Sequence, residues 1–221
     1  MKILITGTSR GIGLSAAEKF LKEGFEVYGI DKDPSPIKDG NFHPYLLDLR
    51  DFSAFPELPE MDYIFLNAGL QNSEDDIDNN LKATIEVAEK YANRPGVKSV
   101  LFNASASARN GYEFPRYVAS KAGVVGYMKN LACRLAKNGT TVNSLSFGGV
   151  LTESNAPVIE NKEAWESIMK VTPLKKWASL DEVVEWVYFL LVVNRSMSGQ
   201  DVLVDNGEND LNNTFVWCGN D

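Results

Sequence analysis

Short apolar runs bounded by turn residues alternate along the chain with longer segments of helical periodicity. The short runs indicate strands, and apolar residues that recur every third or fourth position indicate helices. The expected strands are Ile3–Thr6, Glu26–Ile30, Tyr45–Asp48, Tyr63–Asn67, Ser99–Asn103, Thr141–Ser146 and Asp201–Val204. The expected helices are Gly13–Lys22, Ile77–Tyr91, Pro115–Ala136 and Leu180–Leu191. Gly24 and Gly139 follow two of these helices, where a left-handed residue commonly ends a helix.

This alternation predicts an α/β fold. Strands that alternate with helices form a parallel sheet with right-handed crossovers and helices on both faces. We therefore expect a Rossmann-like, doubly wound sheet of about seven strands in a single domain over residues 1–221. Residues 153–171 show no strand pattern, and their apolar side chains suit a helical flap beside the substrate, with Trp165 as a candidate wall.

Charge and hydropathy exclude several classes of partner. The formal net charge is −8 and no basic stretch offers counter-charge to phosphates, so we expect no nucleic-acid partner. No apolar run is long enough to span a membrane, and a strand at the N-terminus leaves no room for a signal peptide. Cys133 and Cys218 show neither metal-ligand spacing nor a disulfide framework. We expect Cys133 to be buried, no metal site, and a cytoplasmic protein.

A glycine-rich turn joins the first strand to the first helix. Glycines there let the backbone turn sharply and approach a pyrophosphate, and the helix N-terminus offers free N–H groups to the anion. The spacing G-x-x-x-G-x-G differs from the commoner G-x-G-x-x-G, and three glycines alone are weak support. Their position directly after a strand favours a dinucleotide site. Its expected residues are Gly7, Ser9, Arg10, Gly11, Ile12 and Gly13.

Asp31 closes the second strand, 18 residues beyond Gly13. A carboxylate there accepts hydrogen bonds from an adenosine ribose and repels a 2′-phosphate, which favours NAD over NADP. Arg10 and Lys32 bring positive charge to the same region and favour NADP instead. A solvated turn carboxylate is the alternative interpretation of Asp31. We give the carboxylate more weight, so NAD is the expected cofactor and NADP the less favoured one.

Two other strand ends contribute candidate cofactor residues. Asp48 is a candidate for bonding the adenine amino group or for capping the turn that follows it. Asn67, Ala68 and Gly69 end the fourth strand, on the carboxyl edge where ligands bind in such sheets. By itself that tripeptide is an ordinary turn sequence.

Tyr117 and Lys121 lie near the start of the helix that follows the fifth strand. Four residues are about one helical turn, so the phenol and the ammonium share a face. A tyrosine is a weak acid–base group at its ordinary pKa of about 10, and a nearby ammonium favours the phenolate. Such a tyrosine can take a hydroxyl proton as hydride leaves, or return it. The spacing Y-x-x-x-K is common by chance, and its weight comes from its position in this fold.

With these residues identified, the chain resembles the short-chain dehydrogenase/reductase family, in its single-domain branch. The matching positions are Thr6–Gly13, Asn67–Gly69, Asn80, Ser105, Tyr117, Lys121, Asn143–Thr152 and Ser198–Gly207, nearly end to end. The resemblance implies a Rossmann-like fold, an NAD or NADP cofactor, and hydride transfer between the nicotinamide and a carbonyl carbon.

The resemblance also implies a role for each residue of the site. Tyr117 would be the acid/base, and Lys121 both a ligand of the cofactor ribose and a modulator of the tyrosine. A serine would orient the substrate oxygen, and Asn80 would hold a water in a proton relay. Thr152 would contact the nicotinamide carboxamide, and Val150 belongs to the same cofactor loop.

The expected reaction is the interconversion of a secondary alcohol and a ketone on a small molecule. A catalytically silent NAD(P)-binding sensor or scaffold is the alternative, but cofactor binding alone needs no acid/base. The 221 residues leave no room for the substrate domain of larger epimerases and dehydratases. Family analogy suggests a homodimer or homotetramer built on the helices Ile77–Tyr91 and Pro115–Ala136.

The partner serine departs from the family pattern. Ser105 lies twelve residues before Tyr117 and Ser107 lies ten residues before it. In the family the serine usually lies thirteen residues before the tyrosine. Ser105 is therefore preferred and Ser107 stays open. Alternation along a strand would place both hydroxyls on one face.

Three other segments leave questions for the structure. Phe147 replaces a proline that usually precedes Gly148, which leaves the path of the cofactor loop open. Only ten residues separate Gly69 from Asn80, so we expect a substrate pocket open on that side. His43, beside Pro44, is expected in a surface turn. The tail 211–221 could line a partner subunit's pocket or fray.

Overall fold

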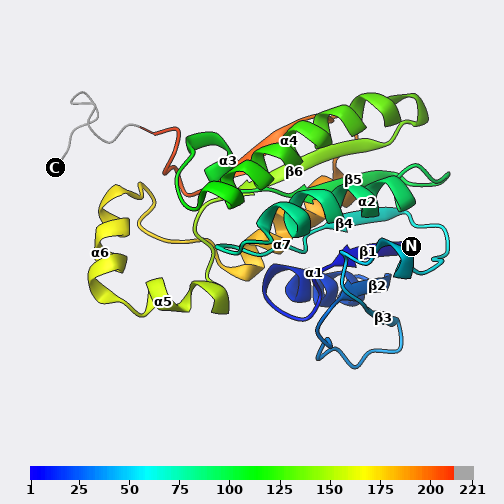
Figure 1. Ribbon diagram of the computed structural model, residues 1–221, viewed down its shortest axis with the longest axis horizontal. Coiled ribbons are helices and arrows are strands. Elements are labelled where there is room, and N and C mark those ends of the chain that lie inside the picture. The colour runs from blue at the N-terminus through cyan, green and yellow to red at the C-terminus, as the bar shows by residue number, and fades with distance from the viewer. Residues whose placement is uncertain (212–221) are drawn as a thin grey trace.

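The computed structural model describes residues 1–211, and within them seven strands form one parallel sheet (Figure 1). The strands are β1 (Lys2–Thr6), β2 (Glu26–Asp31), β3 (Phe42–Leu46), β4 (Tyr63–Leu66), β5 (Ser99–Asn103), β6 (Thr141–Phe147) and β7 (Asp201–Val204). Their order is β3-β2-β1-β4-β5-β6-β7, so the direction of winding reverses between β1 and β4. The carboxyl edge at that reversal is where ligands bind in doubly wound sheets.

Helices cover both faces of the sheet, which confirms the predicted fold class. The α-helices are α1 (Gly11–Lys22), α2 (Ala83–Tyr91), α3 (Ser107–Asn110), α4 (Pro115–Leu135), α5 (Ala156–Ile159), α6 (Lys162–Val171) and α7 (Leu180–Tyr188). Segments Ile77–Lys82 and Phe189–Val193 are π-helical, and Phe52–Ala54, Ala136–Asn138 and Glu153–Asn155 are short 3-10 turns. As predicted, Gly24 and Gly139 follow helical segments with left-handed φ angles of +79° and +74°.

Alternate residues along the strands pack into two separate hydrophobic cores, one on each face of the sheet. Leu4, Ile64 and Val100 pack with α2 and α4 on one face. Their strand neighbours Ile5 and Phe65 pack with α1 and α7 on the other. Strands that are buried on both faces read as continuous apolar runs, which is why periodicity located most of them.

The edge strand β3 corrects two expectations. It spans Phe42–Leu46 instead of Tyr45–Asp48, so His43 lies in a strand and not in a turn. The His43 ring packs against the Tyr28 ring at 4.6 Å between centroids. Proline lacks the backbone N–H that a strand ladder uses, but an edge strand tolerates it, and Pro44 pairs with Gly29 there.

Two expectations about helices also need correction. The segment expected as one helix, Ile77–Tyr91, begins with a π-helical turn over Ile77–Lys82 before α2. Such turns are short insertions in a helix and are frequent at functional sites.

Cys133 is exposed on α4, not buried. No helix among residues 1–211 is long and apolar enough to cross a membrane.

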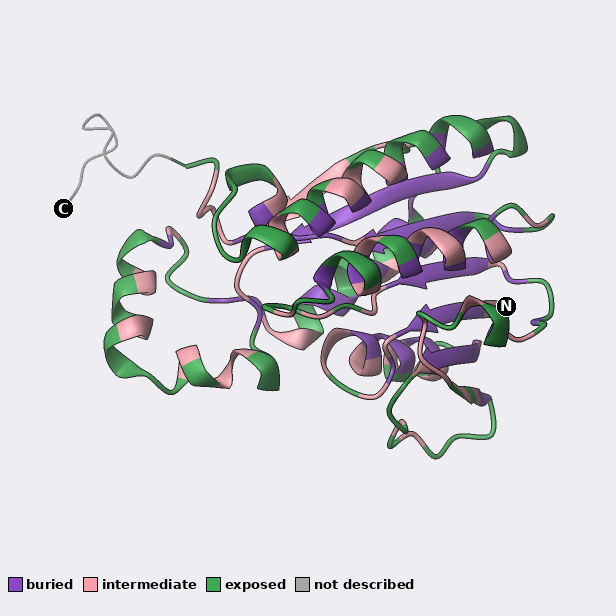
Figure 2. Cartoon of the chain, viewed as in Figure 1, coloured by how far each residue is buried: buried purple, intermediate pink, exposed green. Residues whose placement is uncertain are grey.

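Residues 153–171 are helical, as expected of a flap, and lie apart from the sheet (Figure 1). Neither α5 nor α6 contains a buried residue, whereas the five inner strands β2, β1, β4, β5 and β6 are almost entirely buried (Figure 2). We call residues 153–171 the flap. The two readings of the tail concern residues that lie, apart from Leu211, outside the described part of the chain.

Candidate active site

The ends of β1, β4 and β5 are tied together by side chains at the carboxyl edge of the sheet. The Thr6 hydroxyl accepts hydrogen bonds from the backbone N–H groups of Asn67 (2.9 Å) and Ala68 (3.0 Å). The Asn67 amide donates to the Thr6 carbonyl at 3.0 Å and accepts from the Asn103 amide at 2.9 Å. The Asn103 carbonyl then accepts from Lys121 Nζ at 2.8 Å. One chain of bonds thus runs from the glycine-rich turn to Lys121.

The glycine-rich turn brings the start of α1 against the end of β1. A Cβ on Gly13 would lie 1.9 Å from the Gly7 carbonyl oxygen, so only glycine fits this contact. Gly7 and Gly11 have left-handed φ angles of +79° and +56°. The first turn of α1 contains no acidic residue, so the positive end of the helix dipole faces the cavity without a competing carboxylate.

A cavity of about 230 Å³ lies above this turn, and we call it the cofactor cavity. The residues expected to bind the cofactor that line it are Gly7, Ser9, Arg10, Gly11, Ile12, Asp31, Asp48, Asn67, Ala68, Gly69 and Thr152. Gly13 packs beneath it against Gly7. The Asp31 carboxylate accepts from the backbone N–H groups of Ser9 (2.8 Å) and Asp33 (3.0 Å). The turn therefore fixes this carboxylate at the cavity wall.

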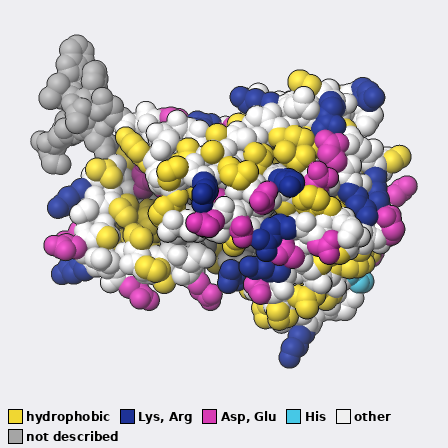
Figure 3. Space-filling view, in the orientation of Figure 1, with side chains coloured by type: hydrophobic (Ala, Val, Ile, Leu, Met, Phe, Trp, Pro, Cys, Tyr) yellow, Lys and Arg dark blue, Asp and Glu magenta, His cyan; other side chains and the backbone are white. Residues whose placement is uncertain are grey.

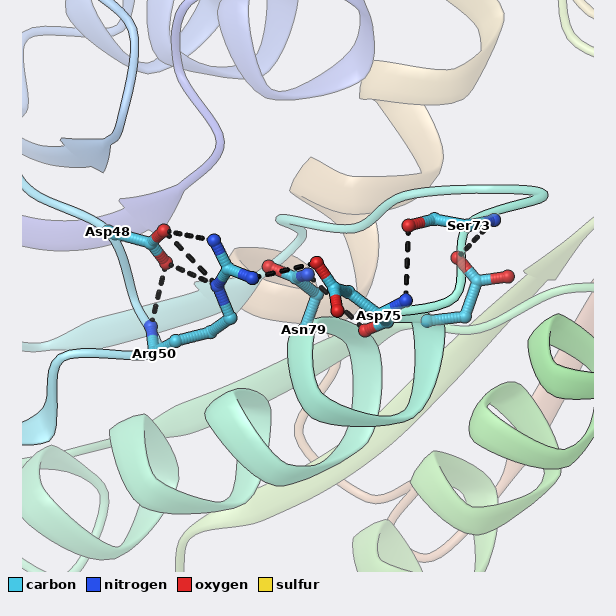
Figure 4. Close-up of polar contacts among 6 residues, drawn as sticks. Asp48, Arg50, Ser73, Asp75 and Asn79 are labelled. Carbon is cyan, nitrogen blue, oxygen red and sulfur yellow. Dashed lines mark hydrogen bonds and ion pairs between the residues drawn. The ribbon is translucent and has the colours of Figure 1, made fainter.

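Asp48 belongs to an ion-paired wall of the cofactor cavity that the sequence did not reveal (Figure 4). It lies two residues beyond β3 and accepts the Arg50 backbone N–H at 2.9 Å, as a turn cap does. The Arg50 guanidinium contacts Asp48 at 2.7 Å and Asp75 at 2.8 Å. Hydrogen bonds from Arg50 lower the pKa of Asp48. Arg50 thus connects the turn after β3 to the shortened segment before Asn80.

Tyr117 and Lys121 meet at the floor of the cleft. Lys121 Nζ lies 5.7 Å from the centre of the Tyr117 ring, and both residues occupy one face of α4. Lys121 is buried with 4% exposure, and a Cβ on Gly69 would lie 3.4 Å from its Nζ. The Asn103 carbonyl takes one of the three donors of this ammonium, and Lys121 itself lines neither the cofactor cavity nor the cavity that contains Tyr117.

Burial shifts both titratable groups toward their neutral forms. It raises the pKa of Tyr117 to about 12, an effect that Ser105 opposes and that Glu113 and Asp76 reinforce. It lowers the pKa of Lys121 to about 8, and Asp76 opposes that shift. Asp76 is fully buried and one of its carboxylate oxygens has no partner in the described residues. It is therefore a charged neighbour of the pair that sequence reasoning missed.

Asn80 lies in the π-helical turn and is buried with 1% exposure. Its side chain accepts from the Leu70 N–H at 2.7 Å and donates to the Leu70 carbonyl at 2.8 Å. It also donates to the Ser120 hydroxyl at 3.1 Å. Its amide therefore holds the chain after Gly69 in place beside α4.

The two serines lie beyond β5, at the start of α3, and not on the strand as alternation implied. They still meet, because the Ser107 hydroxyl donates to the Ser105 hydroxyl at 2.9 Å. Their outer neighbours differ. A hydrogen bond with Ser105 opposes the rise in the pKa of Tyr117, whereas a hydrogen bond with Ser107 opposes the rise in the pKa of Glu113. Ser105 is thus the serine on the tyrosine side.

A second cavity of about 430 Å³ contains Tyr117 and both serines, and we call it the substrate cavity. Ile12, Asn103 and Thr152 line both cavities, so the two are ends of one cleft. Val150 lines the substrate cavity and forms a β-bridge with Ala178. Phe147 completes β6 and also lines this cavity, so the cofactor loop leaves the strand in place without the usual proline.

The walls of the substrate cavity come from segments whose proximity could not be predicted from the sequence. Of residues 70–80 only Gln71 lines it, so this shortened segment does not close the cavity. The flap contributes Asn155, Ile168 and Val171. Trp177 belongs to the aromatic lining of the cavity, whereas Trp165, the expected wall, does not line the cavity and contacts Trp177 at 5.2 Å between ring centres. The trace of Trp177 in the sequence is the glycine at position 149, because a Cβ there would lie 2.0 Å from the Trp177 indole.

Comparison with known proteins identifies the family. A family model described as enoyl-(acyl carrier protein) reductase matches residues 58–209, more than half of the chain. A curated relative from Buchnera aphidicola, 3-oxoacyl-(acyl-carrier-protein) reductase FabG, is 26% identical over 234 residues, which cover 92% of this chain and 95% of the relative.

Solved structures agree with this result. A 4-hydroxyisoleucine dehydrogenase complexed with NADH has a TM-score of 0.86 at 24% identity, covering 96% of this chain and 99% of its own. A provisionally assigned 2-deoxy-D-gluconate 3-dehydrogenase from Agrobacterium tumefaciens, with bound NADP, has a TM-score of 0.82 at 25% identity, covering 94% and 95%. The first of these supports the fold alone. Taken with the match to the family model, these findings show that the chain belongs to the short-chain dehydrogenase/reductase family and is an oxidoreductase acting on alcohol and carbonyl groups.

Proposed function

We propose that this enzyme interconverts a secondary alcohol and a ketone on a small molecule, with NAD(H) as cofactor and Tyr117 as acid/base. One observation carries the proposal. Tyr117 and Ser105 line the substrate cavity, and Lys121 Nζ lies 5.7 Å from the Tyr117 ring and bonds to the carbonyl of Asn103, a residue that lines both cavities. A group held there lies within reach of both cavities, as hydride transfer between two bound molecules requires.

The residues of the cofactor cavity fit a dinucleotide. Glycines at positions 7 and 13 leave the turn too tight for any side chain, and α1 presents its first N–H groups to the cavity for a pyrophosphate. Asp31, fixed by Ser9, is placed for ribose hydroxyls. When bound, the nicotinamide supplies or accepts the hydride. Lys121 would hold the second ribose, and Thr152 and Val150 the nicotinamide side.

The protein residues handle the proton. In the oxidation direction Tyr117 accepts the hydroxyl proton of the alcohol, and in reduction it returns a proton to the carbonyl oxygen. The Ser105 hydroxyl, on the tyrosine side of the serine pair, would orient that oxygen. The Lys121 ammonium favours the phenolate form of Tyr117 and so works against the effect of burial. The side chain of Asn80 is bonded to Leu70 and Ser120, so we assign it to positioning this part of the site. A relay water held at Asn80 stays part of the proposal.

NAD over NADP is supported by Asp31 at the ribose position. Arg10 and Lys32 line the same cavity and act in the opposite direction. We further propose that the enzyme forms a homodimer or homotetramer through α2 and α4, as family analogy suggests. Size-exclusion chromatography with light scattering measures that state directly.

The decisive experiment follows NADH and NADPH consumption over a panel of ketones, with Tyr117→Phe as the test variant. Loss of the phenol should lower kcat by about 10²–10⁴-fold, because it removes the acid/base while the ring still fills its space. Cofactor affinity, measured by fluorescence titration, should be unchanged. An unimpaired Tyr117→Phe enzyme would contradict the mechanism. Tight NAD binding without turnover on a broad panel would favour the sensor.

A further inference from the structure

The substrate cavity contains two carboxylates. Glu113, between α3 and α4, and Glu208, after β7, line it together with Tyr117. The other polar side chains of its lining are neutral, and within residues 1–211 no Lys or Arg is among them. Negative charge therefore faces the space beside the proposed acid/base, and nothing in that lining balances it.

Glu113 is held in place by its backbone and by hydrogen bonds with Gln71 and Ser107. Its φ of +81° is left-handed, which is uncommon for a residue other than glycine and is often found at functional sites. Its carboxylate accepts from Gln71 Nε2 at 3.2 Å. Glu113 is an exposed residue, and partial desolvation of its carboxyl by the surrounding atoms raises the pKa of that carboxyl, an effect that the hydrogen bonds with Gln71 and Ser107 oppose. Among the described ion pairs none includes Glu113, so a cation beside it would stabilise its charged form.

Glu208 enters the cavity from the opposite segment of the chain. One of its oxygens accepts the Thr172 hydroxyl at 2.6 Å. The other would lie 3.3 Å from a Cβ on Gly148, a residue of the cavity wall. No described ion pair includes Glu208 either. Glu113 is exposed and Glu208 is half-buried, and both line the ligand cavity with no ion-pair partner among the described residues, so a cation bound there would meet two negative charges.

The rest of the chain does not provide the missing cation. Residues 212–221 contain no Lys or Arg. Arg109, on α3, is bound to Asp201 at 3.0 Å and lies 3.8 Å from Asp210, and it does not line the cavity. The described lining therefore places no cation beside these carboxylates, and a positive charge on the bound molecule would supply it.

We propose that the substrate is a small alcohol or ketone that carries a protonated amine, received by Glu113 and Glu208. This inference rests on the proposed function, and it changes nothing in the reaction. Coulombic attraction favours an ammonium in this cavity and repulsion disfavours a carboxylate or a phosphate. An acyl thioester on a phosphopantetheine arm brings a phosphate and finds no cationic side chain in the described lining.

Three alcohols with one carbon skeleton test the proposal: 4-amino-2-butanol, 1,3-butanediol and 3-hydroxybutyrate. They present an ammonium, a neutral hydroxyl and a carboxylate at the same distance from the reacting carbon. With NAD⁺ at neutral pH, kcat/KM for the amine should exceed that for the diol by about tenfold or more, the usual effect of one charge-assisted hydrogen bond. The hydroxyacid should be the poorest of the three.

Variants then assign the preference to the two carboxylates. Glu113→Gln and Glu208→Gln should each move the amine-to-diol ratio of kcat/KM toward one. Glu163→Gln is the matched control, because Glu163 is an exposed residue of α6 outside the cavity lining, and it should keep the wild-type ratio. If one variant does not fold, the other and the wild-type ranking still decide.

Several results would overturn the inference. Equal kcat/KM for all three alcohols, or a preference for the hydroxyacid, contradicts it directly. An unchanged ratio in both glutamine variants would remove the carboxylates from recognition. A rise in KM for NAD⁺ by the same factor with every alcohol would show that they serve the nicotinamide charge instead. If not even the diol turns over while cofactor binds, the proposed function itself fails, and this inference with it.

Discussion

The two ends of the cleft are built in different ways. The cofactor cavity is lined mainly by residues at strand ends and at one helix N-terminus, and most of them lie within the first 70 residues. The substrate cavity is formed by side chains from segments as distant as Gln71, Glu113, Trp177 and Glu208. Figure 3 shows hydrophobic side chains gathered at the flap end of the molecule. The first end tolerates little change in the chain, whereas the second can change one side chain at a time.

Gly13→Ala should have the largest effect on the cofactor end. The new Cβ would overlap a backbone oxygen at 1.9 Å, so α1 or the turn must move. We expect the free energy of unfolding to fall by about 1–3 kcal/mol, as for overpacked cores, and cofactor binding to be lost. Thermal unfolding and a fluorescence titration measure the two effects.

The control for this variant is Gly126→Ala, in the exposed interior of α4. Nothing lies within 4 Å of a Cβ there. Because glycine is a poor helix former, this change should stabilise the protein by about 0.5–1 kcal/mol. Equal behaviour of the two variants would show that the close approach of α1 to β1 contributes nothing.

Ser105→Ala and Ser107→Ala test the boundary between the two ends. Removal of the hydroxyl beside Tyr117 should lower kcat by about 10–100-fold, the value of one hydrogen bond to a charged or developing-charge group. Ser107→Ala should lower it by only a few-fold, because Ser107 faces Glu113. A larger loss in Ser107→Ala would give the orienting role to Ser107. Steady-state kinetics on one ketone suffices.

Asp31→Ala should have the smallest effect, on cofactor choice alone. Loss of the carboxylate removes a repulsion from the 2′-phosphate of NADPH, so the ratio of kcat/KM for NADH over NADPH should fall by about tenfold. Asp33→Ala is the control, since Asp33 lines the same cavity two residues further along the chain. An unchanged ratio in Asp31→Ala would show that the ribose lies elsewhere.

The sequence located the cofactor end better than the substrate end for physical reasons. Buried parallel strands and the glycine-rich turn leave strong local patterns, because each needs particular residues at fixed spacing. The start of the edge strand β3 was not predicted, because Pro44 lies within it and proline usually indicates that a strand is interrupted. The contact of Arg50 with Asp75 and the approach of Trp177 to Gly149 join residues that only the tertiary fold brings together.

At the reacting end the pattern was partly local. Tyr117 and Lys121 share a helix, so spacing predicted their common face. The π-helical turn that buries Asn80 leaves no mark in hydrophobic periodicity, and Asp76 looked like one acidic residue among several. The serines were placed on a strand that ends two residues earlier. Their contact with Tyr117 and Glu113 depends on the start of α3, which spacing alone does not define.

The weak packing of the flap affects how fast substrate can enter and product can leave. With no buried residue, α5 and α6 are held by few apolar contacts, so they open at a lower free-energy cost than the sheet. Ile168 and Val171 nevertheless line the substrate cavity. Substrate entry and product exit can therefore proceed through local opening of the flap while the cofactor end stays folded. Turnover would then be limited by the rate of that opening whenever the chemical step is faster.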